Sequence, residues 1–521
     1  VGDLRALADS KWSRRQLWNR SYSESRTTGV PGMILELLSH QNFTDMKYGL
    51  DPSFRFLVSR AVYKGMLKFL AERYGRKYAV QPLPVKDFAV TLDGDEAVLR
   101  WAPTEDALEP TAAPKSYLLY TKVDDGAFDL GKDVGDELSC RVGMEPGHVY
   151  SFRIVAVNDG GRSFPSETLS AGRPSGRSSK PVLVVNNFTR LSAPAWFDTP
   201  VYAGFDMGTD SGVPYMEDIS YAGRMYGFRR MEPWLDDDCP GFGGSYVDEA
   251  GKITPGNTFD YPSVHGKALL ESGHPFWSSS ASAFAADTTL RRGAFAVDLI
   301  CGKQVTTRFG RGEQPNRFTV FPAEMQSALT ACTKAGVHLI ISGARIGTDI
   351  WSGIYGDSVG HFSDDTPAAL FATTVLGWRW RADRPTRSFD VAPYTGKPLV
   401  TEQPVKKGAK PAPQPPLPPT FSLGGTHVGR ADRYVVDNPD GIVPAADGAF
   451  SLLRYADTRV DAAVAYAGGP EETEGDAFSE GGTHWRYGAV SFGFPLEVLP
   501  DGDIAAYLRA ALDWFILLGS Q

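Results

Sequence analysis

Long apolar runs, closely spaced cysteine pairs and a basic stripe are all missing from this sequence. No run of about eighteen apolar residues occurs, so no transmembrane helix is predicted. The net charge is -9 and no basic stripe stands out, which argues against nucleic acid as a partner. The cysteines lie far apart and form no CxxC pair, which excludes a zinc ribbon and a disulfide framework. They are Cys140, Cys239, Cys301 and Cys332.

The start of the chain lacks a recognisable targeting segment. The sequence begins at Val1 with neither a start methionine nor a signal-peptide pattern, so any such segment lies outside it. At 521 residues the chain is too long for one hydrophobic core, and its size predicts about three domains. Its composition is that of a soluble globular protein, with 12% aromatic residues. A multidomain protein is therefore expected.

The first predicted domain, residues 1–78, has an α/β pattern. The run VPGMILELLSHQNF begins at Val30, and its apolar part from Met33 to Leu38 predicts a buried central strand of a parallel sheet. Glu36 interrupts this run, and burying a carboxylate without a partner is costly. Two explanations stay open. Glu36 lies at the strand end and reaches solvent or Arg26, or it is a catalytic or metal-adjacent acid at the carboxyl end of a strand.

A long helix is predicted directly after this strand, from Asp51 to Arg76. Asp51 suits the N-cap and Pro52 suits the first helical position. Apolar residues then recur at spacings of three and four, which predicts that one face of the helix packs on a sheet. The helix is expected to end near Gly75.

Residues 82–174 have the pattern of an all-β domain. Short alternating strands such as AVLRWAP, SYLLYTKV and HVYSFRIVAVN are separated by turns rich in glycine and aspartate, which predicts a β-sandwich. Trp101 lies on an early strand, Tyr117 on the next, and the run MEPGHVYSFRIVAVNDGGRSFPSE follows. On these residues the segment resembles a fibronectin type III domain. The resemblance implies a spacer or docking module, so the function is expected elsewhere.

The first domain resembles the carboxy-terminal part of the zinc-dependent N-acetylmuramoyl-L-alanine amidases of the amidase 3 type. In that family a VP-x-x-L-x-E-x-x-F-x-S-N-x-x-D pattern carries the catalytic glutamate. The residues that match it in order are Val30, Pro31, Glu36, Asn42 and Asp45. The resemblance implies a peptidoglycan hydrolase in which Glu36 is the catalytic general base beside a zinc-bound water.

The zinc ligands that this resemblance implies are missing. In the family two histidines and a glutamate precede the catalytic residue, whereas no histidine precedes Glu36. The resemblance therefore implies zinc only if an upstream segment exists, and otherwise a remnant without a cofactor. His40 as a recruited ligand stays open beside the more ordinary role of a surface histidine. His265, Glu271 and His274 do not share one helical face, so a cap or surface role is favoured over a metal site.

The third predicted domain, residues 180–521, alternates strands with helices, which indicates a doubly wound parallel sheet. Its buried strands are PVLVVNNF, AFAVDLI and VHLIISG, and a proline-rich insertion lies near residues 404–419. Ligands of such sheets bind at the carboxyl ends of the strands. The candidate binding rim there consists of Asn186, Asn187, Ser342, Arg345 and Asp349.

The order of elements and the ending VSFGFPLE of this domain resemble the class I glutamine amidotransferase-like (flavodoxin-like) fold. Catalytic members carry a His-Pro-Glu on the last strand and a nucleophilic cysteine at a strand-to-helix elbow. In this sequence Phe494, Pro495 and Glu497 occupy the position of the His-Pro-Glu. The elbow position is occupied by IISGARIG, which contains Ser342 and no cysteine. The resemblance implies the fold without its catalytic triad. A glycine turn is favoured over a nucleophilic Ser342, because ISGAR does not fit G-x-S-x-G.

These patterns lead to two hypotheses. The first is a secreted or periplasmic cell-envelope protein related to peptidoglycan amidases, with peptidoglycan or another glycan as its partner. The alternative is a non-catalytic glycan-binding or scaffold protein in which both enzyme-like domains have lost their chemistry. Both hypotheses exclude nucleic acid as a partner and a membrane span.

Overall fold

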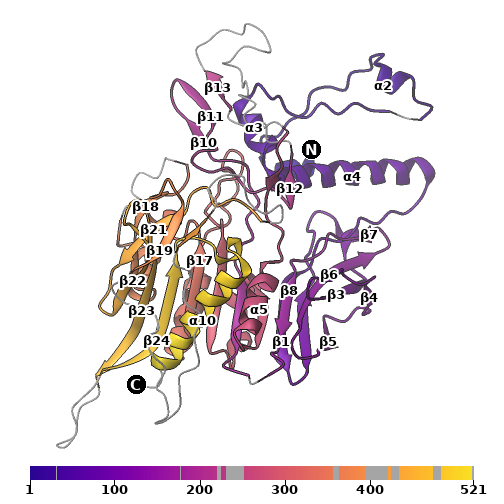
Figure 1. The fold of residues 1–521 in the computed structure, drawn as a ribbon. Coiled ribbons are helices and arrows are strands. Elements are labelled where there is room, and N and C mark those ends of the chain that lie inside the picture. Colours follow the sequence, from indigo (N-terminus) through magenta and orange to yellow (C-terminus); the bar gives the residue numbers. More distant parts are fainter. Residues whose placement is uncertain are drawn as a thin grey trace, which may run out of the picture. The chain divides into compact units, whose positions relative to one another are not determined.

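The computed structural model describes residues 1–30, 32–176, 178–219, 225–229, 251–355, 363–394, 420–423, 433–472 and 483–518. The chain forms two compact units (Figure 1). The amino-terminal unit comprises residues 1–76, 191–254 and 307–317, and the main unit comprises residues 77–190, 255–306 and 318–521. Parts of the predicted third domain thus belong to the amino-terminal unit. The proline-rich insertion at 404–419 and Pro31 lie outside the described residues.

The amino-terminal unit is built mainly from helices. Three of its short strands form an antiparallel sheet in the order β10-β11-β13. Its helices are α1 (Gly2–Leu7), α2 (Ser23–Arg26), α3 (Phe43–Gly49) and α4 (Pro52–Tyr74), and its strands are β10 (Trp196–Asp198), β11 (Tyr202–Phe205), β12 (Glu217–Asp218) and β13 (Met225–Arg229).

The buried strand predicted around Glu36 is wrong. Residues 32–39 form no helix or strand, Met33 is 66% exposed, and Glu36 is exposed as well. A strand needs a neighbour for its backbone N–H and C=O groups. In the described part of this unit β10, β11 and β13 pair with one another, and residues 32–39 pair with none of them. The Glu36 carboxylate therefore stays in water and carries no burial cost.

Helix α4 begins and ends as predicted but packs differently. The Asp51 side chain accepts hydrogen bonds from the backbone N–H of Ser53 and Phe54, and Gly75 closes the helix with a φ of 62°. Only glycine adopts this left-handed conformation readily. The predicted packing on a sheet is wrong, because α4 contacts α1 and α3.

A small aromatic core holds the amino-terminal unit together. Tyr48, Phe54 and Phe309 are buried against one another with ring centroids 5.2 to 6.5 Å apart. Gly310 lies against Tyr48, and a Cβ at this position would come within 1.9 Å of the ring. Any side chain at residue 310 would therefore displace the tyrosine.

Residues 82–174 form the predicted sandwich of two antiparallel sheets. One sheet has the order β1-β2-β5, and the other has β4-β3-β6-β8 with the short β7 beside β6. Trp101 and Tyr117 meet edge to face inside it, 5.6 Å apart. The strands are β1 (Lys86–Asp93), β2 (Glu96–Ala102), β3 (Ser116–Val123), β4 (Lys132–Asp133), β5 (Ser139–Gly143), β6 (Val149–Asn158), β7 (Gly161–Arg162) and β8 (Leu169–Gly172), and a 3-10 turn, η1, covers Pro110–Ala112.

The rest of the main unit contains a parallel sheet with helices on both faces. Parallel pairing gives the order β15-β9-β16-β17-β24, and β23 and β22 extend this sheet in the antiparallel sense. The strands are β9 (Val182–Asn186), β14 (Thr254–Pro255), β15 (Phe276–Ser280), β16 (Ala296–Gly302), β17 (His338–Gly343), β18 (Trp378–Asp383), β19 (Asp390–Pro393), β20 (Phe421–Ser422), β21 (Asp440–Pro444), β22 (Ala449–Tyr455), β23 (Asp461–Glu472) and β24 (Thr483–Phe492).

The helices cover this sheet in two groups. Helices α5 and α10 pack together on one face (Figure 1). On the other face α7 packs against both α6 and α9. The helical elements are α5 (Tyr261–Glu271), α6 (Ala281–Ala286), η2 (Thr288–Arg291), α7 (Ala323–Lys334), α8 (Thr348–Trp351), α9 (Pro367–Thr374), η3 (Leu496–Val498) and α10 (Asp501–Leu518). The buried strands predicted from PVLVVNNF, AFAVDLI and VHLIISG are confirmed as β9, β16 and β17. Among the described residues, no helix has the length and apolar character needed to cross a membrane.

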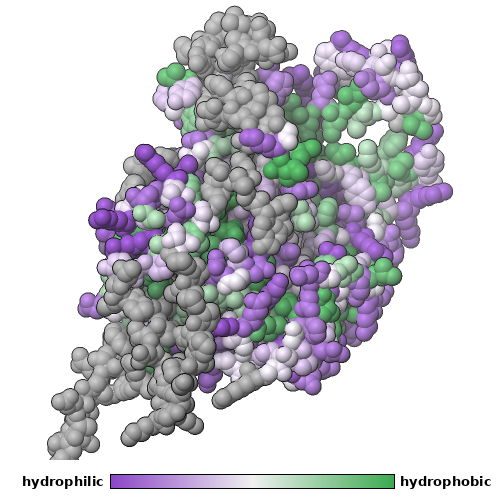
Figure 2. Space-filling model, in the orientation of Figure 1, coloured by the Kyte–Doolittle hydropathy of each residue, from purple (hydrophilic) through white to green (hydrophobic). Residues whose placement is uncertain are grey.

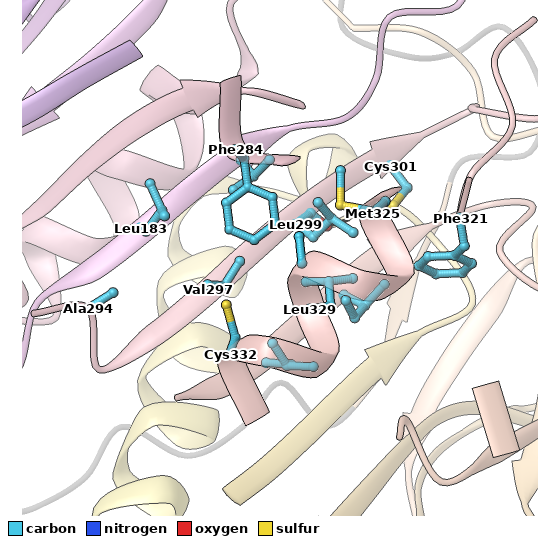
Figure 3. Packing of buried hydrophobic residues seen from close by; sticks show 14 of the residues in the cluster. Leu183, Phe284, Ala294, Val297, Leu299, Cys301, Phe321, Met325, Leu329 and Cys332 are labelled. Atoms are coloured by element: carbon cyan, nitrogen blue, oxygen red, sulfur yellow. Dashed lines mark hydrogen bonds between the residues drawn. The ribbon is translucent and has the colours of Figure 1, made fainter. Parts of the chain in front are cut away.

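The main hydrophobic core lies between the sheet and helix α7. Val297, Leu299 and Cys301 of β16 face Met325, Leu329 and Cys332 of α7, and Leu183 and Phe284 complete this layer (Figure 3). The predicted role of Cys301 and Cys332 as buried thiols is confirmed.

The sandwich and the parallel sheet are joined by a polar contact inside one continuous core. Strand β8 and strand β15 pair at Gly172 and Phe276. The Ser278 hydroxyl donates to the carbonyl oxygen of Ser170 and accepts from its N–H, both at 2.7 Å, and both residues are fully buried. The sandwich is therefore fixed to the α/β part and is not a loosely linked spacer.

Candidate binding site at the carboxyl edge of the sheet

The strand order reverses between β9 and β16, which is where open α/β sheets place their ligands. Asn186 is the last residue of β9 and pairs with Ile300 of β16. On the far side of β16, Ile300 pairs with Ser342 of β17. The structure thus brings two residues of the predicted rim to the same level of the sheet, on either side of Ile300.

Asn187 and Asp349 both hold the backbone of Val320. The Asn187 amide donates to the Val320 carbonyl oxygen at 2.9 Å, and Asp349 Oδ2 accepts from the Val320 N–H at 2.8 Å. Asp349 Oδ1 also accepts from the N–H of Thr306. Burial raises the pKa of Asp349, and these backbone hydrogen bonds oppose the rise. Both side chains therefore position loops of their own chain.

Asn186 connects the sheet to the sandwich. Its amide Nδ2 lies 2.6 Å from Oε2 of Glu167, which belongs to the segment before β8. Burial raises the pKa of Glu167 to about 7, although the hydrogen bond from Asn186 opposes the shift. The Asn186 Oδ1 atom is buried without a hydrogen-bond partner among the described residues. Glu167 was not predicted, and no sequence pattern would have found it.

Ser342 and Arg345 complete the predicted rim, and both are buried. The Ser342 hydroxyl has no hydrogen-bond partner among the described residues, so no general base contacts it there. Arg345 forms an ion pair with Asp383, with the nearest atoms 3.7 Å apart. These two side chains lie inside the protein and do not line an open surface.

The crevice at this point of the sheet is closed by the chain itself. After β9, the backbone N–H groups of Thr189 and Arg190 donate to Gln304 Oε1, at 3.1 and 3.0 Å. The Arg190 guanidinium donates in turn to the carbonyl oxygen of Lys303 at 3.0 Å. The loops after β9 and β16 are therefore bonded to each other where a ligand of an open α/β sheet would lie.

A second polar cluster lies under helix α5, and the sequence analysis missed it. His265 of α5 is fully buried, with Nδ1 2.7 Å from Asp298 Oδ2 and Nε2 3.4 Å from Glu497 Oε2. Burial alone would lower the pKa of His265, but the two carboxylates raise it to about 10. His265 is therefore a buried imidazolium that donates from both ring nitrogens. The cap or surface role predicted for it is wrong.

Glu497 has further partners that fix its position. Tyr434 donates its hydroxyl proton to Glu497 Oε1 at 2.5 Å, and Arg433 donates to the carbonyl oxygens of Glu497 and Leu499. The Glu497 at the end of VSFGFPLE thus belongs to a structural ion network. A signal existed for this cluster, because Asp298 interrupts the apolar run AFAVDLI in a strand that is buried throughout.

Asp440 forms a third buried polar centre. It accepts hydrogen bonds from the backbone N–H groups of Gly347 and Thr348 and from the Trp380 indole, at 2.6, 2.9 and 3.1 Å. Burial and the neighbouring Asp383 raise the pKa of Asp440 to about 7. The carboxylate therefore fixes the start of α8 and is fully occupied by protein donors.

The predicted catalytic residue belongs to the amino-terminal unit. Glu36 and His40 are both exposed, and no hydrogen bond to either side chain occurs in the part of the chain that the structure describes. Asn42 accepts from the N–H of Asp45 at 3.2 Å, and Asp45 accepts from the N–H of Ser39 at 2.9 Å. These motif positions cap helix α3. The described residues contain no group of three His, Cys, Asp or Glu that could hold a metal ion, so they do not fit zinc.

An open pocket of about 380 Å³ lies in the amino-terminal unit. Its lining is largely apolar but includes Arg317, which forms an ion pair with Asp51. It contains no acid–base pair that could activate Ser53, its only hydroxyl. The lining residues are Leu7, Ser53, Leu57, Phe309, Gln314, Pro315 and Arg317.

Comparison with known proteins supports only the sandwich. No protein family and no curated protein matches this chain. Several of the solved structures that match part of it are fibronectin type III domains or contain them. The FN5 domain of Drosophila Lar is 22% identical, covering 18% of this chain and 99% of its own, with a TM-score of 0.15. The third fibronectin III domain of human KIAA0343 protein is 17% identical, covering 20% and 92%, with a TM-score of 0.17.

The twitchin kinase region from C. elegans also matches, with 23% identity and a TM-score of 0.15. The match covers 17% of this chain and 16% of the twitchin region. Residues 82–174 form a sandwich similar to a fibronectin type III domain. Its strand pairing at residues 82–174 carries this assignment, with β1-β2-β5 in one sheet and β4-β3-β6-β8 in the other.

Proposed function

We propose that this protein is a non-catalytic binding or scaffold protein of the cell envelope or the secreted fraction. One observation carries the proposal: at the carboxyl edge of the sheet, the rim side chains that would hold a ligand hold the protein's own backbone. Asn187 and Asp349 bind the backbone of Val320. The Gln304 side chain binds the backbone of the loop that follows β9. Polar groups already paired in this way are not available to a substrate without breaking the fold.

The rigid connection between the sandwich and the parallel sheet supports a scaffold role. The Ser170 and Ser278 contact and the Asn186 and Glu167 contact are buried or half-buried, so the two parts present one combined surface. Peptidoglycan or another glycan remains the proposed partner, and it follows from the resemblance of residues 30–45 to muramoyl-alanine amidases. The envelope or secreted location follows from the same resemblance.

Peptidoglycan hydrolysis is the second candidate, and the exposure of Glu36 favours it. A solvent-exposed carboxylate is open to a substrate, as a general base must be. The zinc that the resemblance implies does not fit the described residues, so no step through it is derived. The amidotransferase-like reading of the α/β part is proposed for the fold alone, because Phe494 replaces the histidine and Ser342 has no base beside it.

Purified chain incubated with peptidoglycan sacculi separates the two candidates. A scaffold sediments with the sacculi, releases no soluble muropeptides with or without added zinc, and binds equally well as Glu36→Gln. Zinc-dependent release that Glu36→Gln abolishes would establish the hydrolase and overturn the proposal. Failure to sediment with sacculi or with any other insoluble glycan would refute glycan as the partner.

A further inference from the structure

Residues 12–30 and 32–35 form an arm of the amino-terminal unit with an unusual surface. Apart from the single turn α2, the arm has no helix or strand. Leu17 is 80% exposed and Trp18 is 63% exposed. Five further large apolar side chains of the arm are exposed, namely Tyr22, Val30, Met33, Ile34 and Leu35. So many exposed large apolar side chains within one short segment indicate an interaction site.

The same arm carries a concentration of positive charge. Arg14, Arg15, Arg20 and Arg26 are all exposed, and Lys11 precedes them, whereas Glu24 is the only acidic residue between residues 11 and 35. The net charge of -9 for the whole chain conceals this local excess. The guanidinium of Arg20 lies 4.2 Å from the centre of the Trp18 ring, so charge and apolar surface are in direct contact.

Helix α4 of the same unit adds a second apolar stripe. Met66, Phe69, Leu70 and Tyr74 are exposed at spacings of three and four along its last turns. Such spacing places them on one side of the helix. Figure 2 shows apolar side chains, in green, gathered at the surface where Figure 1 draws α2 and α4.

Charge and apolarity together select the partner. A second copy of the chain would bring two arginine-rich arms together, and like charges repel. A soluble polyanion would satisfy the arginines but leave the aliphatic side chains of Leu17, Met33 and Ile34 in water. An anionic lipid surface satisfies both, because acyl chains accept the apolar groups and phosphates accept the arginines. Tryptophan and tyrosine favour this boundary between headgroups and acyl chains.

We propose that the arm docks on an anionic lipid surface, with Leu17 and Trp18 inserted at headgroup level and Arg14, Arg15 and Arg20 on lipid phosphates. The docking is peripheral and requires no spanning helix. It is independent of glycan binding by this protein, so either can fail without the other.

The test is co-sedimentation of the full chain with vesicles of equal parts phosphatidylglycerol and phosphatidylcholine, and with phosphatidylcholine alone. The wild type should bind only the anionic vesicles, and less at high salt. Arg14→Gln with Arg15→Gln should weaken binding by about tenfold or more. Leu17→Ser with Trp18→Ser should weaken it similarly. Leu130→Ser removes a leucine that is 97% exposed on the sandwich and should change nothing.

Three results would overturn the proposal. The first is equal binding to both vesicle types, or binding to neither. The second is a dimer in solution that Leu17→Ser with Trp18→Ser dissociates, because the surface would then be an interface between copies. The third is vesicle binding that depends on the arginines but survives Leu17→Ser with Trp18→Ser, because a soluble polyanion would then serve as well. All the altered residues are exposed, and circular dichroism checks that the variants remain folded.

Discussion

Nδ1 of His265 lies 2.7 Å from Oδ2 of Asp298, and both side chains are fully buried between helix α5 and strand β16. A second pair of the same chemistry, His148 and Asp124, is 2.6 Å apart on the surface of the sandwich, where both side chains are half-exposed. Among the described residues, one histidine–aspartate pair is thus buried and another is half-exposed. His265 also contacts Glu497, whereas His148, in the part of the chain that the structure describes, forms an ion pair with Asp124 alone, so His148 is the exposed comparison for the buried cluster.

Substitution of His265 by glutamine should destabilise the protein far more than the same change at His148. Removing one partner of a buried ion pair leaves an uncompensated charge and costs about 3–5 kcal/mol. The exposed pair contributes much less, because water and salt screen it. Urea unfolding of the two variants measures the difference. Equal losses of stability would show that His265 and Asp298 do not form the buried ion pair described here.

Alkaline pH should weaken the main unit through His265. Its pKa is raised from 6.5 to about 10, so the folded state holds this proton more tightly than the unfolded chain. Protonated His265 contributes its full share of the free energy of unfolding below pH 6.5, and this share is lost as the pH rises towards 10. Unfolding free energies of the wild type and His265→Gln, measured across this range, should converge at high pH. Parallel pH profiles would contradict the assignment of the charge.

Acid should weaken the same unit through His338. This ring stacks on Phe515 with centroids 4.5 Å apart, and its Nδ1 accepts from the N–H of Gly488 at 2.8 Å. Burial lowers its pKa from 6.5 to about 4. The folded state therefore holds this proton less tightly than the unfolded chain, and stability is lost as the pH falls from 6.5 towards 4, by about 3 kcal/mol. NMR titration of the histidine checks the pKa directly, and an ordinary value near 6.5 would refute it.

The sandwich and the parallel sheet should unfold in a single transition that Ser278→Ala weakens. Loss of the hydroxyl leaves the buried N–H and carbonyl of Ser170 unpaired, which costs at least about 2 kcal/mol. Ser178→Ala, at an exposed serine nearby, should have no measurable effect. Calorimetry follows both variants. Two separated transitions for the main unit in the wild type would show that the two parts fold independently.

Two helical glycines should respond to alanine in opposite directions. At Gly266 in α5, a Cβ would lie 2.1 Å from the Phe276 ring, so Gly266→Ala should destabilise the main unit by about 1–3 kcal/mol or more. At Gly65 in α4 nothing lies within 4 Å, and Gly65→Ala should stabilise the helix by about 1 kcal/mol. Hydrogen exchange in each helix measures both effects. A tolerated Gly266→Ala would contradict the close packing of α5 on β15.

Much of the fold was predictable where the signal is local. Helix α4 begins at Pro52 because Asp51 caps it, and it stops at Gly75 because glycine adopts the left-handed turn. The alternation of apolar and polar residues along β3 and β6 was enough to predict the sandwich. Continuous apolar runs were enough to predict β9, β16 and β17. In each case residues close in sequence determine the outcome, either through caps or through the face they bury.

The strand expected around Glu36 failed because a strand is a property of its neighbours. The run from Met33 to Leu38 has the composition of a central strand, but composition does not supply the pairing partner, and the segment is irregular and exposed. Asn186 and Ser342 lie near the carboxyl ends of β9 and β17, where the topology predicted them, because parallel strands end at the same edge of a sheet. Their burial was missed, because the loops that bind these residues come from distant parts of the chain.

Local sequence was sufficient for the start and end of α4, for the alternation of the short strands, and for the sandwich at residues 82–174. These outcomes depend on dihedral preferences and on burial patterns within a few residues. The tertiary structure alone decided that His265 is a buried cation, that Glu167 reaches Asn186, and that the arm around Trp18 stays exposed. Charge states and exposure depend on groups brought together from distant positions, and no local pattern records which of them will meet.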